Sequence, residues 1–460
     1  MRRWLVACLS LLSIFFYYSC TPEEEIITLD PAVSLRFSQD TVLFDTIFTT
    51  RQSITQRLKV YNPQAKAVET SISLGGGSLS PYSIYVNGQQ GTVFENVRLR
   101  GGDSLLILVE AFIDPQNENT PFLVEDSLRF TTNESRQTVR LRSWGQNAYF
   151  IGSWHIQQDT SLSADLPYVI SDSIWVQESG HLKIPAGSRL YFEQDASLQV
   201  DGRLQVRGDV GLPVLFTHTR QDGAYANAPG QWRGILLSET SHDHVIEYAT
   251  IRNAEVGVFL VQTDSDTVPD LKISHTVIEN MSVNGILAAN ADIDGFNLLI
   301  NHCVVNALGN FGSGYYRYTH CTFANDAGIF SREGPVLFFA DTLMDLPTSS
   351  QAFRLALHNN IVWGNRSQEL LIALEQADSR VAIQANLIRA ETPLPSATES
   401  NIYNEDPQFN DPVIYDYSLD STSAAIDQGI PTFVASDLAG NERDAQPDLG
   451  AYEFHKMKEE

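Results

Sequence analysis

The sequence has few cysteines, few basic residues and no apolar run long enough to cross a membrane. Four cysteines in 460 residues exclude a fold held together by a disulfide framework. The 30 Lys and Arg residues against 56 Asp and Glu residues give a formal net charge of −26, which argues against sequence-independent binding to nucleic acid. Apolar residues still make up 43 % of the chain, which is enough for a packed core.

The first twenty residues indicate export. Two arginines precede a largely apolar run from Trp4 to Tyr18, which is shorter than the ~20 residues that span a bilayer. Cys20 ends the run, and three glutamates follow closely. The arrangement resembles a bacterial lipoprotein signal of the Bacteroidetes type, which implies removal of residues 1–19, lipidation of Cys20, a linker over 20–32 and anchoring at the outer-membrane surface. A plain secretory signal with an incidental cysteine is the alternative.

Residues 33–147 contain short β-rich runs separated by turn residues. Several runs alternate apolar and polar residues, as Leu58 to Tyr61 do, which is typical of half-buried strands. About seven or eight such strands over this length predict a β-sandwich. The stretch Leu99–Ser104, with Asp114-Pro115 after the following run, resembles the Hydin-like immunoglobulin-like domains. That resemblance implies a spacer or docking module.

Residues 150–400 repeat with the two-residue period of β-strands. Apolar triplets recur between Ser173 and Thr217, and they start 8, 8, 8, 6 and 10 residues apart with glycines between them. The outer residues of each triplet share one face, as the strand period requires. Three steps make about one coil, so each strand meets a parallel neighbour one coil later. This spacing predicts a parallel β-helix.

A five-residue phrase recurs further along, beginning with Ala249-Thr250-Ile251-Arg252-Asn253. Stacking its copies predicts an interior column of third residues: Ile251, Ile278, Val305, Phe323, Val362 and Ile388. The first residues form a second column: Ala249, Thr276, Cys303, Cys321, Asn360 and Asn386. The residues at one corner, where Asn tolerates left-handed backbone, are Asn253, Asn280 and Asn325. The repeats resemble the right-handed parallel β-helix proteins of pectate-lyase-like architecture.

Two cysteines share the second predicted column. Cys303 and Cys321 would lie on consecutive coils, where a disulfide with a Cα separation of roughly 4.4–6.8 Å is conceivable. Buried free thiols acting as small apolar residues are the favoured alternative. His302 and His320 precede the cysteines, but adjacent side chains on a strand point in opposite directions, which argues against zinc.

Residues 401–455 carry four short motifs in order: Asp406–Phe409, Ser423–Gly429, Asp437–Arg443 and Asp448–Glu453. Their order resembles the choice-of-anchor Q domain that often follows surface β-helices. The end of a solenoid exposes unpaired strand edges, so we expect this segment to cap the end of the β-helix. We also expect Arg443 to pair with an aspartate such as Asp427 or Asp448.

The β-helix architecture hosts polysaccharide lyases and hydrolases, so catalysis is the main alternative to binding. Lyases of this architecture use Ca²⁺-binding carboxylates and a Lys or Arg base, and the repeat region has just two lysines, Lys183 and Lys272. Near Lys272, three residues are weak Ca²⁺ candidates, with a solvated acidic turn as the alternative: Asp264, Asp266 and Asp270. A metal or acid/base cluster is one interpretation of His242, His244 and Glu247, and two exposed loop histidines are the commoner alternative. The signature of pectin hydrolases and a Ser/His/Asp motif are missing.

Candidate ligand-binding residues lie on two parts of the repeats. Outward positions of the phrase form a mixed strip: Arg252, Glu279, Asn306, Trp363 and Arg389. Tyr315, Tyr316 and Arg317 follow a Gly-rich stretch, and aromatic rings flanked by polar groups can stack on sugar rings. Tyr316 also fits simple packing on a strand. The candidates are therefore Tyr315, Tyr316, Arg317, Trp363 and Arg252.

The sequence thus predicts an all-β protein with an immunoglobulin-like β-sandwich, a right-handed parallel β-helix and a C-terminal cap. We expect a monomeric, non-catalytic surface lipoprotein that binds extracellular glycan or protein, without nucleic acid or a required cofactor. A calcium-dependent polysaccharide lyase or a glycoside hydrolase is the alternative, and a structural envelope protein is the third hypothesis.

Overall fold

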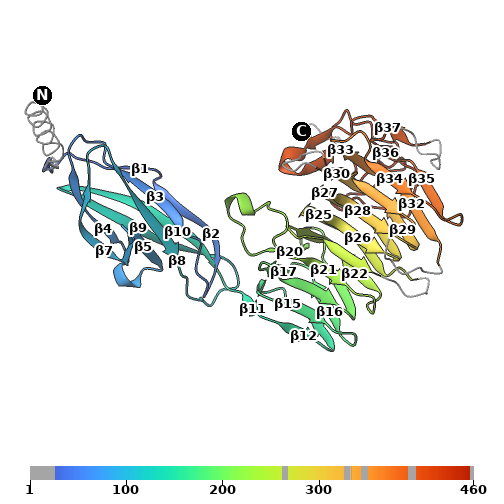
Figure 1. Ribbon diagram of the computed structural model, residues 1–460, viewed down its shortest axis with the longest axis horizontal. Coiled ribbons are helices and arrows are strands. Elements are labelled where there is room, and N and C mark those ends of the chain that lie inside the picture. The colour runs from blue at the N-terminus through green and yellow to red at the C-terminus, as the bar shows by residue number, and fades with distance from the viewer. Residues whose placement is uncertain are drawn as a thin grey trace, which may run out of the picture. The chain divides into compact units, whose positions relative to one another are not determined.

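The computed structural model describes residues 26–261, 268–325, 332, 334–342, 351–391 and 400–455 (Figure 1). Cys20 and the predicted signal lie outside the described residues. The chain divides into two compact units, Met1–Asn147 and Ala148–Glu460. Within the described residues, no helix has the length and apolar character needed to span a membrane. The predicted all-β fold with a parallel β-helix is confirmed by the strand pairing given below.

The first unit is a sandwich of two five-stranded sheets. One sheet contains, in spatial order, β1 (Arg36–Phe37), β3 (Gln56–Tyr61), β8 (Ser104–Ala111), β5 (Tyr82–Val86) and β6 (Gln89–Gly91). The other contains β2 (Thr41–Phe48), β10 (Ser135–Gln146), β9 (Phe122–Thr132), β4 (Val68–Leu74) and β7 (Val93–Leu99). Buried and less buried residues alternate along β4, so its apolar side chains join one core between the sheets. A short 3-10 helix, η1 (Gly77–Leu79), follows β4.

The second unit is a parallel β-helix in which successive coils stack from β11 to β37 (Figure 1). A full coil contributes three strands, which we group into rows A, B and C. Rows A and B belong to an 18-stranded sheet and row C forms a 9-stranded sheet. Row A consists of β13 (Asp159–Ser161), β16 (His181–Pro185), β19 (Arg203–Arg207), β22 (His244–Glu247), the first halves of β25 (Leu271–Met281) and β27 (Ile293–Cys303), β29 (Gly314–Thr319), β32 (Phe353–His358) and β35 (Arg380–Gln384).

Row B follows row A in each coil. It consists of β11 (Tyr149–Ile151), β14 (Tyr168–Ile170), β17 (Arg189–Phe192), β20 (Val214–His218), β23 (Ala249–Arg252), the second halves of β25 and β27, β30 (Thr322–Asn325), β33 (Ile361–Gly364), β36 (Leu387–Ile388) and β37 (Ile402–Tyr403). Row C consists of β12 (Trp154–Ile156), β15 (Ser173–Val176), β18 (Ser197–Val200), β21 (Gly234–Leu237), β24 (Val258–Val261), β26 (Asn284–Ala289), β28 (Asn306–Phe311), β31 (Leu337–Ala340) and β34 (Leu370–Ala373). A 3-10 helix, η2 (Gly223–Tyr225), lies between β20 and β21.

The interior column of row B differs from the prediction at one coil. Ile278 pairs with Ile300, and Ile300 pairs with Phe323, so Ile300 occupies the position predicted for Val305. Val305 is 39 % exposed. The prediction carried the 27-residue spacing of the preceding coil forward, whereas this coil is shorter. The remaining members of the predicted column are buried and in register.

The same shift separates the two cysteines. Cys303 pairs with Met281 and lies beyond the interior column, while Leu298 takes the place predicted for Cys303. Cys303 and Cys321 are both buried and free, as the favoured alternative stated. Burial raises the pKa of each thiol to about 12. Both cysteines therefore pack as small neutral side chains.

Left-handed residues mark two corners of the coil. Asn253 and Asn280 have φ of 67° and 61°, as predicted, but the third such residue is His302 and not Asn325. The corner between rows A and B has a left-handed residue in six successive coils: Tyr248, His275, Asn297, His320, Asn359 and Ala385. Asn and His tolerate this geometry better than most residues. We call this column the A–B corner.

Residues 404–455, which we call the C-terminal segment, lie along row B. We expected a cap on the end of the helix, and β37 does add a final row B strand. The rest of the segment, including the hairpin β38 (Phe409–Asp411), η3 (Pro412–Ile414) and β39 (Asp416–Leu419), packs on the outer face of row B. Tyr417 contacts the cluster containing Leu299, while Leu419 and Leu449 join the one containing Ile361. The expectation of an end cap is thus wrong for most of the segment, because the outer face of row B is apolar and needs a cover.

Candidate functional site

The C-terminal segment covers most of the predicted strip on row B. Trp363 packs against the apolar cluster that includes Leu419, and the guanidinium of Arg389 lies 5.0 Å from its ring centre. Arg252 lies 3.7 Å from Glu279, whose pKa is raised by burial and lowered in part by that arginine. Asn306 does not belong to the strip, since it is a buried residue of row C. Arg252 and Trp363 are thus only partly exposed, and they serve packing.

Tyr316 is an interior residue, so its candidacy for ligand binding is wrong. Its hydroxyl donates to the carbonyl of Phe311 at 2.8 Å, and the residue is fully buried. Burial raises its pKa well above the usual range. Alternation along β29 explains the difference, because Tyr316 and Tyr318 face inward while Tyr315 and Arg317 face outward.

Tyr315 and Arg317 lie on the outer face of row A. Tyr315 is 39 % exposed, and Arg317 makes two hydrogen bonds of 2.8 and 2.6 Å to Asp294 on the preceding coil. Tyr315 is beside Arg354 on the next coil, and Arg354 is beside Arg380. Tyr315, Arg354 and Arg380 therefore follow one another on the outer face of successive coils, and both arginines are exposed.

Row A reverses the charge balance of the chain. Its strands carry three acidic residues, Asp159, Glu247 and Asp294, and each of these pairs with a cation. They carry seven basic residues: Lys183, Arg203, Arg207, Lys272, Arg317, Arg354 and Arg380. Among the described residues, Lys272 and Arg354 have no acidic partner. We call the outer surface of these strands the row A face.

The predicted calcium candidates lie only partly within the described residues, whereas the predicted His cluster lies within them and does not form a metal site. No group of three His, Cys, Asp or Glu side chains there could hold a metal ion. Asp264 and Asp266 lie outside the described residues. Asp270 is 4 % exposed and its Oδ2 accepts the backbone N–H of Asp292, so it links successive coils.

The three residues of the predicted His cluster have separate roles. His244 is buried, and its Nδ1 accepts the backbone N–H of Leu204; burial lowers its pKa to about 3. His242 is exposed beside Asp243, and Glu247 pairs with Arg207. Their side chains do not converge on one point.

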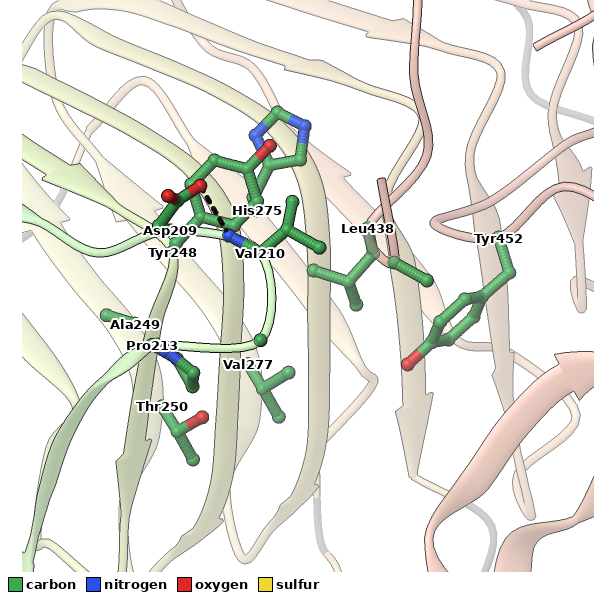
Figure 2. Close-up of a pocket in the computed structure, with 12 residues that line it drawn as sticks. Asp209, Val210, Pro213, Tyr248, Ala249, Thr250, His275, Val277, Leu438 and Tyr452 are labelled. Carbon is green, nitrogen blue, oxygen red and sulfur yellow. Dashed lines mark hydrogen bonds between the residues drawn. The ribbon is translucent and has the colours of Figure 1, made fainter. Parts of the chain in front are cut away.

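A pocket that the sequence did not predict opens between the C-terminal segment and the coils (Figure 2). Its volume is about 220 Å³, and its polar lining residues are Asp209, Tyr248, Thr250, His275 and Tyr452. The turn at Gly440 (φ +87°) closes one side, because a Cβ there would lie 2.9 Å from Val210. Sequence spacing gave no sign of this pocket, since its two walls lie far apart along the chain. Several lining residues do lie in patterns noted above, Thr250 in the repeated phrase and Leu438 and Tyr452 in the C-terminal motifs, but no pattern brought them together.

Hydrogen bonds from the C-terminal segment fix the histidine of this pocket. Arg443 donates to Asn297 Oδ1, so the Asn297 amide nitrogen donates both to the carbonyl of Ser436 and to His275 Nε2. His275 Nε2 must then be an acceptor, which places the ring proton on Nδ1. Burial lowers the pKa of His275 to about 4, so the ring is neutral at pH 7.

The comparisons with known proteins give no family. No protein-family model and no curated protein matches the chain. Solved structures with some similarity include a family 123 glycoside hydrolase from Clostridium perfringens, at 12 % identity over 25 % of this chain and 26 % of that one, with a TM-score of 0.19. The chain thus spans about a quarter of that protein.

Two other structures match over most of their length. They are the catalytic domain of a GH87 α-1,3-glucanase, at 9 % identity over 72 % of this chain and 80 % of that one, and Dex49A from Penicillium minioluteum, at 9 % identity over 78 % and 70 %. Both TM-scores are 0.18, so neither match carries an argument about function. The strand pairing itself identifies the chain as a parallel β-helix joined to a β-sandwich.

Proposed function

We propose that this protein is a surface lipoprotein that binds an extracellular glycan on the row A face. The observation that carries the proposal is the exposed Tyr315 ring, flanked by Arg317 on its own strand and by Arg354 on the next coil. An aromatic face takes the apolar side of a sugar, and guanidinium groups donate to its hydroxyl and carboxylate oxygens. The excess of cations on row A favours acidic glycans over neutral ones.

Glycan arrays with the full chain test this function. We expect binding to acidic oligosaccharides, and loss of most of that binding with Tyr315→Ala or Arg354→Ala. Arg57→Ala removes an exposed arginine of the sandwich and is the matched control. Unchanged binding by both row A variants would contradict the proposal. Cys20→Ala should release the protein from membranes, and unchanged membrane fractionation would count against the anchor.

A lyase or hydrolase acting on the same glycan is the second candidate. Asp292 immediately precedes β27 and Asp294 is its second residue, on the side of the strand that Tyr315 also faces. Asp292 accepts the backbone N–H of Tyr315 at 2.6 Å, and Asp294 is paired with Arg317. Glycosidases need one carboxyl held protonated and another ionised. Assays for new reducing ends and unsaturated products, with Asp294→Asn as the test variant, separate catalysis from binding.

A further inference from the structure

We propose that the pocket between the C-terminal segment and the β-helix is a second binding site, which accepts one neutral sugar ring. The ring is either a free monosaccharide or the terminal residue of a glycan chain. The site uses residues separate from the row A face, so each proposal can fail alone. No residue of this pocket was a sequence-based candidate.

The size of the pocket limits the ligand. A volume of about 220 Å³ lies below the ~300–1,000 Å³ typical of pockets for drug-sized ligands. It is many times the roughly 10–15 Å³ that a cavity needs to hold one water. Val277 of the strands and Leu438 of the C-terminal segment provide apolar lining (Figure 2). A single six-membered ring with one apolar face suits this space.

The polar groups of the lining have unused hydrogen-bonding capacity. Among the described residues, no group bonds to the hydroxyls of Thr250, Tyr248 or Tyr452, although all three line the pocket. Asp209 accepts the N–H of Val210 with one oxygen at 2.8 Å, and its second oxygen has no such partner. Figure 2 shows the Tyr452 ring reaching from the C-terminal segment with its hydroxyl turned toward the strands. Several donors and one strong acceptor thus border one small space, as recognition of adjacent sugar hydroxyls requires.

The charges in the pocket favour a neutral ligand. Burial raises the pKa of Tyr452 to about 12 and raises that of Tyr248, so both hydroxyls keep their protons at pH 7. His275 is neutral for the reason given above. Asp209 is the one acidic residue in the lining, and its carboxylate would repel an anion. A neutral ring can instead donate hydroxyl protons to its carboxylate.

Titration calorimetry of the full chain against a panel of neutral monosaccharides tests the site. We expect saturable binding of at least one of them, with Kd about fivefold weaker in Thr250→Val and in Tyr452→Phe, since each removes one neutral hydrogen bond. Both changes nearly conserve volume, so they should preserve folding, and thermal unfolding checks this. Tyr85→Phe removes a tyrosine hydroxyl from β5 of the sandwich, outside both proposed sites, and is the matched control, with an unchanged Kd.

A competition experiment distinguishes a free monosaccharide from the terminal residue of a glycan chain. An oligosaccharide carrying the selected monosaccharide at its end should compete with the free ring if the site takes chain ends, and should not compete if only the free ring fits. Absence of binding by every neutral monosaccharide, or a Kd unaffected by both pocket variants, would overturn the proposal. Tighter binding of a uronic acid or an amino sugar than of any neutral ring, weakened by Thr250→Val and Tyr452→Phe, would overturn the assignment of a neutral ligand.

Discussion

Rows A and B of the β-helix are adjacent in every coil, and their outer faces have opposite roles. The outward residues Leu299, Ile361 and Leu387 of row B are apolar and fully covered by the C-terminal segment. The outward residues Lys272 and Arg354 of row A are charged and exposed. The chemistry of outward-facing residues, once the register is known, therefore indicates which face is covered by polypeptide and which faces solvent.

The cover on row B is fixed by buried polar contacts as well as by apolar packing. Asn359 bonds both backbone groups of Ile430, and its carbonyl accepts the N–H of Gly450. Arg443 pairs with Glu453 at 3.0 Å and with the carbonyl of Gly450, so its expected pairing with an aspartate side chain is wrong. These contacts involve the A–B corner, whose left-handed residues turn polar side chains and backbone groups toward the segment.

Among the substitutions that compare rows A and B, loss of the buried ion pair between Arg443 and Glu453 should lower the free energy of unfolding the most. Arg443 and Glu453 side chains are 2 % and 4 % exposed, so Arg443→Met leaves a buried carboxylate without its partner. We expect the free energy of unfolding of the second unit to fall by about 3–5 kcal/mol. Arg207→Met breaks the exposed pair with Glu247 on row A and should cost about 1 kcal/mol or less. Urea unfolding measures both, and equal losses would contradict the difference between the faces.

Truncation of outward apolar residues should come next. Ile361→Ala removes a fully buried side chain beneath the segment, and we expect a loss of about 2–4 kcal/mol. Val245→Ala removes a partly exposed outward side chain of row A and should cost about 1 kcal/mol or less. Hydrogen exchange should also show faster exchange around Ile361 alone. A similar cost at both positions would mean that the segment adds no burial to row B.

Acidification should weaken the row B cover more than the sandwich, which contains no histidine. His320 bonds to the carbonyl of Asp448, and His275 bonds to Asn297, which is held by the C-terminal segment. Burial and Arg443 lower the pKa of His275 to about 4 and that of His320 to about 3. As pH falls below about 6.5, these histidines are protonated in the unfolded chain before they are protonated in the folded one. Each histidine therefore lowers the free energy of unfolding by up to ~1.4 kcal/mol for each pH unit. The carboxyl of Asp448, with its pKa raised to about 6, opposes this, because the folded state binds its proton first.

The destabilisation from the two histidines exceeds the stabilisation from the one carboxyl, so we expect the free energy of unfolding of the second unit to fall between pH 7 and pH 5. His218 and His244 of the same unit, whose pKa values are lowered to about 4 and about 3, act in the same direction. Unfolding of the full chain at the two pH values, monitored separately for each unit by hydrogen exchange, is the measurement. Equal stability of the second unit at both values would show that these histidines do not couple folding to pH.

The smallest effect on stability is expected at Tyr315. Tyr315→Ala should change the free energy of unfolding by no more than about 0.5 kcal/mol, since the residue is an exposed part of row A. Tyr417→Ala, beneath the C-terminal segment, should cost about 3–5 kcal/mol by analogy with other buried aromatic residues. Thermal unfolding distinguishes the two. A large loss at Tyr315 would indicate a structural role there in place of ligand binding.

Register limited what could be predicted about the site. Alternation on β29 decides that Tyr315 faces outward and Tyr316 inward, but the sequence around them is aromatic on both faces and does not mark the first inward residue. A short coil likewise displaced Cys303 and Val305 from their predicted columns. One-residue or coil-length errors of this kind move a side chain between core and solvent, because the side-chain period of a strand is two.

The sequence by itself determined the β-sandwich and β-helix architectures, the inward column of most coils and the left-handed corners at Asn253 and Asn280. These features depend on local patterns: alternation, coil-length repeats and residues that tolerate positive φ. The tertiary structure alone decided that residues 404–455 cover row B, that Arg443 reaches Glu453, and that Tyr452 and His275 line one pocket. Those contacts join segments distant in sequence, and packing between two complementary surfaces selects them, which no local pattern records.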